Sequence, residues 1–373
     1  MSLQTPNDDE NYMRRALTLA GAGEGDVEPN PMVGAVIVRG DVVLGVGYHQ
    51  KFGGPHAEIN ALAACTDSPQ GATLYVTLEP CCHHGKTPPC VDAILNAGIA
   101  RVVVALEDPF PAVSGKGIAA LQSAGVKVEV GLLETEAKQL LAPYLKRVHT
   151  GKPWVIAKWA MTLDGKIAAR DGSSKWITGE ASRFHVQELR GRVDAILVGS
   201  GTAIQDDPSL TARLPSTRTP TRVILDRSLK SPLSLKVLQT ARETPTILIT
   251  AKNASLEKQQ QLRDLGVEVL GLEATESSAQ IDEILANLGK RKWTNLLVEG
   301  GGALLGAFID AKAVDEVYVF VAPKLIGGSE AVSPVGGIGL ASISEALEFE
   351  SVDTDIYGED LLFRGRVKRS AAR

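Results

Sequence analysis

The sequence predicts an α/β protein built from two domains. Helical and strand-like segments alternate along most of the 373 residues, which is typical of sheets covered by helices. A cluster of residues that disfavour regular structure, His-Thr-Gly-Lys-Pro at 149–153, interrupts this alternation, and a new series of short apolar runs follows it. A chain of this length usually forms more than one domain. We therefore predict domains over 1–149 and 150–373.

The first domain is expected to alternate helices and strands from residue 8 onward. Three acidic residues at 8–10 favour a first helical turn, and the polar residues 39–41 are typical of a turn between two strands. Helices are predicted over 8–22, 56–64, 90–97, 115–124 and 134–145, and strands over 33–38, 42–48, 72–78, 101–106 and 126–130. This arrangement puts His56 and Cys90 at helix N-termini, which stabilise thiolates, and Cys81 in the loop after a strand.

The second domain is expected to contain short buried strands, several of them separated by helices, and to end in antiparallel strands. Its short apolar runs are typical of buried strands, and helical stretches separate several of them. Strands are predicted over 154–159, 195–198, 222–225, 246–249, 267–270 and 295–298, and helices over 179–190, 255–265, 280–288 and 303–310. The last strands, over 314–321, 348–352 and 361–367, follow one another with no predicted helix between them.

Composition and charge restrict the classes of function. Hydrophobic residues make up 44% and charged residues 22%, as in ordinary globular proteins, and no apolar run approaches the roughly 18 residues of a membrane span. The net charge of −5 argues against a nucleic-acid-binding surface, although a few local cations would suffice for a small phosphorylated ligand. The first ten residues are polar and acidic, unlike a secretory signal, so we expect a cytoplasmic protein with reduced thiols.

The most informative motif combines His56-Ala57-Glu58 with Cys81 and Cys90. One imidazole and two thiolates give zinc three ligands and leave a position for water, as in catalytic zinc sites. Glu58 is placed to take a proton from that water and pass it to a leaving amine, the arrangement of zinc deaminases. The alternatives are a disulfide between Cys81 and Cys90, or cysteines that act only as small buried hydrophobes. The motif favours a hydrolytic deaminase.

Three motifs of the second half combine a strand end with a polar or glycine-rich turn. The run 298–306, Val-Glu-Gly-Gly-Gly-Ala-Leu-Leu-Gly, would let backbone amides approach a phosphate at a helix N-terminus, but it does not fit the Rossmann pattern cleanly. The runs 158–166 and 199–208 are polar, and each is as consistent with a solvated loop as with a ligand site. A dinucleotide site is therefore plausible, and a Rossmann fold is not.

These residues resemble a known family over nearly the whole chain. The N-terminal half resembles the cytidine-deaminase-like zinc domain. Within that group, the runs 77–81 and 87–90, with eight residues between Cys81 and Cys90, and the upstream runs 29–34 and 47–49 are similar to the bifunctional riboflavin-biosynthesis deaminase/reductases. The C-terminal half resembles the reductase domain of the same proteins, which has a dihydrofolate-reductase-like fold. The runs that match there are 161–166, 176–178, 206–208 and 299–301.

The resemblance implies two consecutive reactions and a set of site residues. The first domain would remove the 2-amino group of a 2,5-diamino-6-(phosphoribosylamino)pyrimidinone, and the second would reduce the ribosyl chain of the product to ribityl with NADPH. One zinc ion per chain would be held by His56, Cys81 and Cys90, with Glu58 as the proton shuttle. The deaminase substrate would be held by Asn30, His49 and Lys86. The NADPH site would be lined by Ala160, Trp176, Thr202, Asp206, Ser228, Gly301, Gly302, Ala303, Leu304, Leu305, Gly306 and Ala307. The reductase substrate would contact Ser174, Arg190, Leu210, Arg213 and Glu299, with the two arginines on its phosphate. Lys158 would face the reacting carbon.

Three positions depart from the family's usual pattern. Cys82 stands where serine is usual and puts a further thiol beside a zinc ligand, Asn60 replaces a frequent histidine, and the glycine turn at 300–302 is richer in glycine than expected.

We expect a small phosphorylated pyrimidine as substrate, no nucleic-acid or membrane partner, and a homo-oligomer. The competing functions are a nucleic-acid or nucleoside deaminase, disfavoured by 5% aromatic content, and a non-catalytic zinc protein, disfavoured by Glu58.

Overall fold

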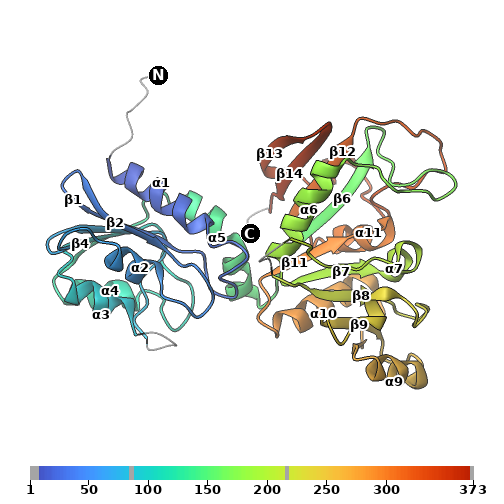
Figure 1. The fold of residues 1–373 in the computed structure, drawn as a ribbon, viewed down its shortest axis with the longest axis horizontal. Helices are drawn as coiled ribbons and strands as arrows, with labels where there is room; N and C mark the ends of the chain where they lie inside the picture. The colour runs from blue at the N-terminus through green and yellow to red at the C-terminus, as the bar shows by residue number, and fades with distance from the viewer. Residues whose placement is uncertain (1–7, 84–87, 215–217, 370–373) are drawn as a thin grey trace. The chain divides into compact units, whose positions relative to one another are not determined.

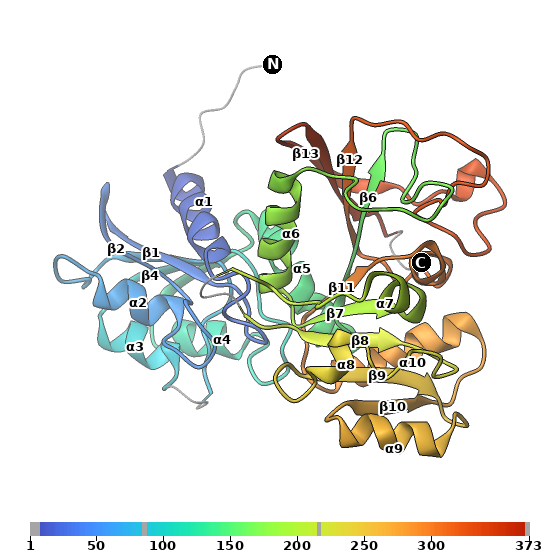
Figure 2. The same ribbon diagram turned by 45° about the vertical axis from the view of Figure 1, so that its right-hand side comes forward.

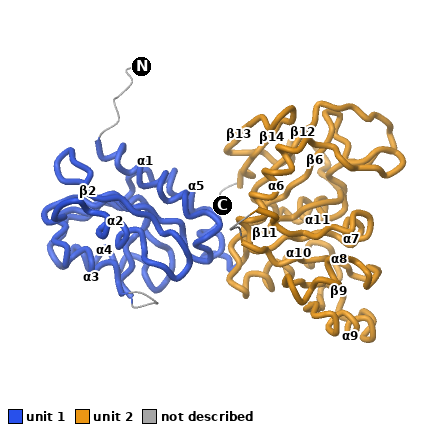
Figure 3. Tube along the Cα trace, viewed as in Figure 1, with its two compact units in different colours: residues 1–151 blue, residues 152–373 orange. Residues whose placement is uncertain are grey.

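The computed structural model describes residues 8–83, 88–214 and 218–369. The chain forms two compact units, residues 1–151 and 152–373 (Figure 3). Both are α/β, as predicted, and each is built around one sheet (Figure 1). Among the described helices, none is long and apolar enough to cross a membrane.

The first unit contains a five-stranded sheet in the order β2-β1-β3-β4-β5. β1 pairs antiparallel with β2 and β3, whereas β3, β4 and β5 are parallel. The strands are β1 (Gly34–Arg39), β2 (Val42–Tyr48), β3 (Thr73–Val76), β4 (Arg101–Val104) and β5 (Lys127–Val130). The helices are α1 (Asp8–Gly21), α2 (Ala57–Ala63), α3 (Cys90–Asn96), α4 (Lys116–Ser123) and α5 (Glu134–Thr150). All ten elements lie where the sequence predicts them, with bounds that differ by a few residues.

Two glycines of β2 let helix α2 lie directly on the sheet. A Cβ atom at Gly45 would come within 2.3 Å of the carbonyl oxygen of Ala61, and one at Gly47 within 2.3 Å of the amide nitrogen of Ala61. Any side chain at these two positions would push the helix away. Because His56 is the residue before α2, this close packing also sets the position of the histidine.

Helix α5 is longer than predicted, and the predicted break is displaced. The prediction ended the helix at residue 145, but it continues through His149 and Thr150. It stops at Gly151, whose φ of 68° is left-handed and is readily adopted by glycine at a helix C-terminus. The histidine and threonine of the predicted breaker cluster are therefore helical, and the unit boundary follows Gly151.

The second unit contains a nine-stranded sheet in the order β10-β9-β8-β7-β11-β6-β12-β14-β13 (Figure 2). All pairs from β10 to β12 are parallel, and the pairs β12–β14 and β14–β13 are antiparallel, as predicted for the C-terminal strands. The strands are β6 (Trp154–Thr162), β7 (Ala195–Gly199), β8 (Thr221–Leu225), β9 (Thr246–Ala251), β10 (Glu268–Leu272), β11 (Asn295–Glu299), β12 (Glu316–Ala322), β13 (Phe349–Tyr357) and β14 (Asp360–Val367).

The helices of the second unit include three short ones that the sequence does not predict. The predicted helices correspond to α6 (Glu180–Arg192), α9 (Leu256–Asp264), α10 (Ser277–Gly289) and α11 (Gly302–Asp310). The additional ones are α7 (Ser200–Asp206), α8 (Lys236–Gln239) and a 3-10 turn, η1 (Ile343–Glu345), between β12 and β13. The polar run 199–208 is therefore largely helical rather than a loop.

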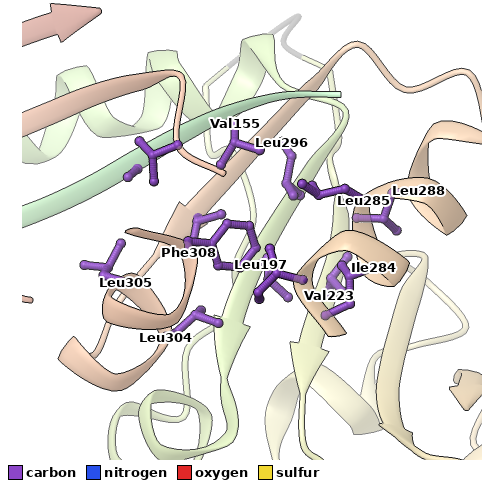
Figure 4. Packing of buried hydrophobic residues seen from close by; sticks show 14 of the residues in the cluster. Val155, Leu197, Val223, Ile284, Leu285, Leu288, Leu296, Leu304, Leu305 and Phe308 are labelled. Carbon is purple, nitrogen blue, oxygen red and sulfur yellow. The ribbon is translucent and has the colours of Figure 1, made fainter. Parts of the chain in front are cut away.

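The parallel sheet is buried on both faces. Alternate residues of each strand enter two cores: Val155, Leu197 and Leu296 pack under α10 and α11, and their neighbours pack under α6, α8 and α9. Phe308 of α11 is fully buried in the first core, beside Leu197 (Figure 4). Each such side chain stabilises the fold by about 1.5–3 kcal/mol relative to an exposed one. Burial on both faces explains why these strands appear in the sequence as continuous apolar runs.

Candidate active sites

The structure brings His56, Cys81 and Cys90 together in the first unit. His56 is the N-cap of α2, Cys90 is the first residue of α3, and Cys81 lies in the loop after β3. The Nδ1 atom of His56 lies 3.5 Å from Sγ of Cys81 and 3.3 Å from Sγ of Cys90. Within the ranges that the structure describes, these residues form the one cluster suited to holding a metal, with ligand atoms within 4.8 Å of one another.

These distances fit zinc. Zinc–sulfur bonds of about 2.3 Å and zinc–nitrogen bonds of about 2.0–2.1 Å place tetrahedral ligand atoms roughly 3.5 Å apart. Three soft or borderline ligands with a fourth position left for water are also the composition of a catalytic site. All four cysteines of the chain are free, so the alternative of a disulfide between Cys81 and Cys90 is not formed.

The two thiols share one proton unequally. The hydrogen bond from Cys90 lowers the pKa of Cys81 to about 4 against the opposing effect of burial, and His56 lowers it further. The same hydrogen bond raises the pKa of Cys90. The backbone amide of Cys90 also donates to Sγ of Cys81 at 3.3 Å, as expected where a thiolate meets a helix N-terminus. In this pair, Cys81 therefore favours the thiolate form, which binds cations.

Glu58 lies beside this cluster in the first turn of α2 and is 3% exposed. Burial raises the pKa of Glu58 to about 7, and the neighbouring His56 partly opposes the shift. A carboxyl group with a pKa near the working pH both accepts and releases protons readily. Its position and its environment suit proton transfer at the metal site.

Glu79 is a buried acidic residue that is not among the predicted site residues. Its carboxylate accepts four backbone N–H groups: Oε1 from Gly117 at 2.8 Å and Ile118 at 3.1 Å, and Oε2 from Gly115 at 2.9 Å and Asp108 at 3.2 Å. The carboxylate thus ties the segment before Cys81 to the N-terminus of α4, where negative charge is favourable. The signal in the sequence was a charged residue at the end of an apolar strand, directly before the Pro-Cys pair.

Two of the three residues expected at the deaminase substrate lie next to the cluster. The side-chain nitrogen of Asn30 lies 3.2 Å from Nε2 of His49, whose Nδ1 lies 2.9 Å from the carbonyl oxygen of Pro55. Because that carbonyl only accepts, Nδ1 carries the proton and Nε2 accepts from Asn30. Burial lowers the pKa of His49, which favours its neutral form, and its ring meets that of His56 edge to face at 5.4 Å. Lys86, the third, lies outside the described residues.

The two departures near the zinc site take no part in the metal cluster. Sγ of Cys82 contacts the carbonyl oxygen of Ala112 at 3.9 Å, and Cys82 is not part of the metal cluster. Asn60 donates to the carbonyl oxygen of Tyr48 at 2.8 Å and so fastens α2 to the end of β2. Neither side chain replaces a ligand.

The second unit contains a group of three charged side chains, in which Glu299 is buried and Lys158 and Arg190 are half-buried. Arg190 on α6 and Glu299 at the end of β11 form a bidentate pair, with distances of 2.8 Å from Nε to Oε1 and 2.6 Å from Nη2 to Oε2. Lys158 is the register partner of Glu299 on the parallel strand β6. Burial alone would raise the pKa of Glu299, but Arg190 and Lys158 lower it to about 2. Burial lowers the pKa of Lys158, and Glu299 opposes that shift.

This pairing changes the expectation for Arg190. The resemblance to the family implies that its guanidinium group binds a substrate phosphate with bidentate geometry, but two of its nitrogens bind Glu299 here. The cation therefore keeps Glu299 ionised inside the protein. A single long-range ion pair of this kind leaves no trace in the local sequence pattern.

The glycine turn after β11 meets the start of α7. Oγ1 of Thr202 accepts the backbone N–H of Gly301 at 3.0 Å, and Gly300 has a φ of 100°. A Cβ atom at Gly300 would lie 2.7 Å from Oγ1 of Thr202, so both the conformation and the space require glycine. Thr202 and Gly301, both expected at NADPH, are thus in direct contact.

The segment 301–307 is only partly available to a cofactor. Leu304, Leu305 and Gly306 are buried, and a Cβ atom at Gly306 would lie 2.3 Å from the carbonyl carbon of Gly336. The connection between β12 and β13 therefore covers this side of α11, and Gly336 donates to the carbonyl oxygen of Gly302 at 2.9 Å. The expectation that all seven residues line NADPH is too broad, since Gly306 serves helix–loop packing and Leu305 the core.

The remaining expected residues are spread over the loops and ends of the second unit. Trp176 is 64% exposed, and the guanidinium carbon of Arg183 lies 4.7 Å from the centre of its ring. Leu210 is 2% exposed and packs in the core, so its side chain is not available to a substrate. The others are Ala160, half-buried on β6; Ser174, half-buried; Asp206, half-buried at the end of α7; and Ser228 and Arg213, both exposed.

Comparisons with known proteins agree with this division. Residues 6–106 match the model of the cytidine and deoxycytidylate deaminase zinc-binding region, and residues 153–363 match the RibD C-terminal domain. The riboflavin biosynthesis protein RibD of Aquifex aeolicus is 46% identical over 355 residues, which cover 95% of this chain and 97% of that protein. The corresponding protein of Actinobacillus pleuropneumoniae is 43% identical, covering 95% and 94%.

Two solved structures are similar over nearly their whole length. Acinetobacter baumannii RibD gives a TM-score of 0.85 at 38% identity, covering 97% of this chain and 99% of that one. A diaminohydroxyphosphoribosylaminopyrimidine deaminase/5-amino-6-(5-phosphoribosylamino)uracil reductase from Thermotoga maritima gives 0.82 at 39% identity, covering 96% and 99%. These matches confirm the predicted fold class of a deaminase-like zinc domain followed by a reductase domain. The chain therefore belongs to the RibD family of riboflavin biosynthesis, in which a zinc-dependent deaminase domain is joined to an NADPH-dependent reductase domain.

Proposed function

We propose that this chain performs two consecutive reactions on one phosphorylated pyrimidine. The first is hydrolytic deamination of 2,5-diamino-6-(5-phosphoribosylamino)pyrimidin-4(3H)-one at its 2-amino group. The second is reduction of the ribosyl side chain to ribityl. The observation that carries the proposal is the buried Glu58 beside His56, Cys81 and Cys90, because a purely structural zinc site needs no proton-transfer group.

In the deaminase half, zinc would be held by His56 through Nδ1 and by the sulfurs of Cys81 and Cys90. Bound zinc lowers the pKa of a water molecule so that hydroxide is available near neutral pH. Glu58 would accept a proton from that water, whose oxygen replaces the amino group on the pyrimidine carbon, and would deliver the proton to the departing amine. The neutral His49 orients the amide of Asn30 toward the pyrimidine, and Lys86 contacts its polar groups or phosphate.

In the reductase half, Lys158, Arg190 and Glu299 line the place where the sugar chain is reduced. NADPH supplies the hydride. Glu299, kept ionised by Arg190, accepts hydrogen bonds from substrate hydroxyls through its remaining lone pairs. Lys158 supplies positive charge near the reacting carbon, and Arg213 binds the phosphate. Thr202, Asp206, Trp176 and the start of the glycine turn hold the cofactor.

Asp206 offers a specific test of the cofactor site. Asp206→Asn should weaken NADPH binding by roughly 10–100-fold, since a hydrogen bond to a charged group contributes about 1.5–3 kcal/mol. Deamination should continue at the normal rate. The dissociation constant of NADPH, measured by titration calorimetry, checks this, with the exposed Asp264→Asn as the control. An unchanged constant in Asp206→Asn would show that Asp206 only ends helix α7.

The chain acts in the cytoplasm as a homo-oligomer on a small molecule. Reducing conditions keep the zinc-binding thiols free, which supports the location in the cytoplasm, and cell fractionation would test it.

Exposed apolar side chains on the hairpin β13–β14 support self-association: Val352 is 50% exposed and Ile356 is 68% exposed. Ile356→Asp should lower the molar mass measured by light scattering, whereas Asp353→Ala should not. An unchanged mass in Ile356→Asp would exclude this face as the interface.

The two units work as separate enzymes. Removing zinc from the intact protein with a chelator should abolish deamination, because the metal site lies wholly within the first unit. Reduction of substrate that has already been deaminated should persist at nearly the full rate. Added zinc should restore the first activity. Equal and reversible loss of both activities on chelation would contradict the proposal.

A further inference from the structure

The connection between β12 and β13 is fastened to a segment that the proposed function places at NADPH. Lys324, two residues after β12, directs its side-chain Nζ to two consecutive main-chain carbonyl oxygens. The distances are 3.0 Å to Trp176 and 2.7 Å to Ile177. These groups are nearly 150 residues apart in sequence, so the contact is tertiary.

The backbone of Lys324 is itself held in place. Its carbonyl oxygen accepts the N–H of Leu163 at 2.9 Å, in the turn that follows β6. The carboxylate of Asp164 in that turn accepts the N–H groups of Ile326 at 3.2 Å and Gly327 at 2.6 Å. The ammonium group of Lys324 is therefore carried by a backbone that is bound to the turn after β6.

The segment that Lys324 holds is exposed and carries a large aromatic ring. Trp176 is 64% exposed, so the core does not fix its position. Arg183 of α6 lies over the ring at 4.7 Å and donates from Nη1 to the carbonyl oxygen of Thr178 at 2.7 Å. Two cationic side chains therefore contact this segment. Lys324 binds its main-chain carbonyl groups, and Arg183 lies over the face of the Trp176 ring.

We infer that Lys324 is a positioning residue of the reductase, which orders Trp176 for NADPH through the main chain. The inference rests on the proposed contact between Trp176 and NADPH. A side chain that is ordered before binding loses less conformational entropy when the cofactor arrives, so the contribution of Lys324 appears in cofactor affinity. Once NADPH and substrate are bound, the segment is held by the ligands as well, and the turnover number should change little.

The test compares NADPH affinity in four single variants and one double variant of the full-length protein. Lys324→Met should raise the dissociation constant of NADPH and its KM about tenfold, which corresponds to about 1.4 kcal/mol. The kcat for deaminated substrate should change less than about threefold, a difference of roughly 0.6 kcal/mol. Lys324→Arg, which keeps a cationic donor, should recover most of the affinity. The control is Lys290→Met, which removes an exposed lysine that bonds locally to Asn287 at 3.2 Å and should leave affinity unchanged.

The fourth variant, Trp176→Ala, separates this inference from the proposed function. If both Trp176→Ala and Lys324→Met weaken NADPH binding, and the double variant is no weaker than Trp176→Ala alone, Lys324 acts through Trp176. If Trp176→Ala weakens binding but Lys324→Met does not, the inference fails and the cofactor contact stands. If Trp176→Ala has no effect, the contact fails and the inference with it. If the losses of NADPH affinity add up in the double variant, the inference about Lys324 is also overturned, because Lys324 would then act independently of Trp176.

Discussion

Glu58→Gln is expected to keep its zinc and to lose deamination by at least about 10²–10⁴-fold, the usual contribution of general acid–base catalysis. The amide has nearly the same shape as the carboxylate, and His56, Cys81 and Cys90 are untouched, so metal binding should persist. The amide cannot accept a proton from water, and burial leaves little room for a substitute base, since Glu58 is only 3% exposed.

The measurement is the deamination rate together with the zinc content of the purified variant. Glu107→Gln, at an exposed glutamate of the same unit, is the control and should behave as the parent protein does. Deamination by Glu58→Gln within a few-fold of the normal rate would exclude the proposed role of Glu58. Loss of zinc from Glu58→Gln would show instead that the carboxylate supports the metal site.

Cys90→Ser is expected to lose zinc and deamination together while reduction of deaminated substrate continues. A serine hydroxyl is not deprotonated near neutral pH and is a poor zinc ligand, so only His56 and Cys81 would remain. Cys90 is fully buried at the start of α3, so water cannot simply take the place of the missing sulfur without disturbing the packing.

Metal analysis of the purified variant checks this expectation. Cys65→Ser provides the matched control, because Cys65 is also a free cysteine of the first unit but donates locally to the carbonyl oxygen of Ala61 at 3.4 Å. Cys65→Ser should retain about one zinc per chain. Stoichiometric zinc in Cys90→Ser would mean that the ligand set is wrong and that Cys82 must be reconsidered.

The zinc site was accessible to sequence analysis because its chemistry is carried by local patterns. Histidine and glutamate stand two residues apart at a helix start, and the two cysteines follow one strand. Element prediction therefore already placed His56 and Cys90 at helix N-termini and Cys81 in the loop after a strand. The alternation of apolar runs likewise revealed both sheets. A residue whose role depends on one helix or strand and on residues nearby in the sequence can be identified from such local patterns.

Other features depend on contacts between distant segments and left no local signal. The bidentate pair of Arg190 and Glu299 joins residues on α6 and β11, and Lys324 reaches a carbonyl nearly 150 residues earlier. In the sequence, Gly306 is consistent with a phosphate-binding turn. In the structure, its lack of a side chain leaves room for the backbone of Gly336. The assignments in the reductase half came from resemblance to a family, and resemblance does not reveal which of these residues face the core.

The order of the two reactions on one substrate is the central claim, and product analysis tests it most directly. The purified protein is incubated with 2,5-diamino-6-(5-phosphoribosylamino)pyrimidin-4(3H)-one, with and without NADPH, and the products are identified by mass spectrometry. Without NADPH, the account predicts a single product in which oxygen replaces one amino group. With NADPH, it predicts conversion of that product to one carrying two further hydrogens on the sugar chain. Unchanged substrate without NADPH, or reduction that precedes deamination, would contradict the account.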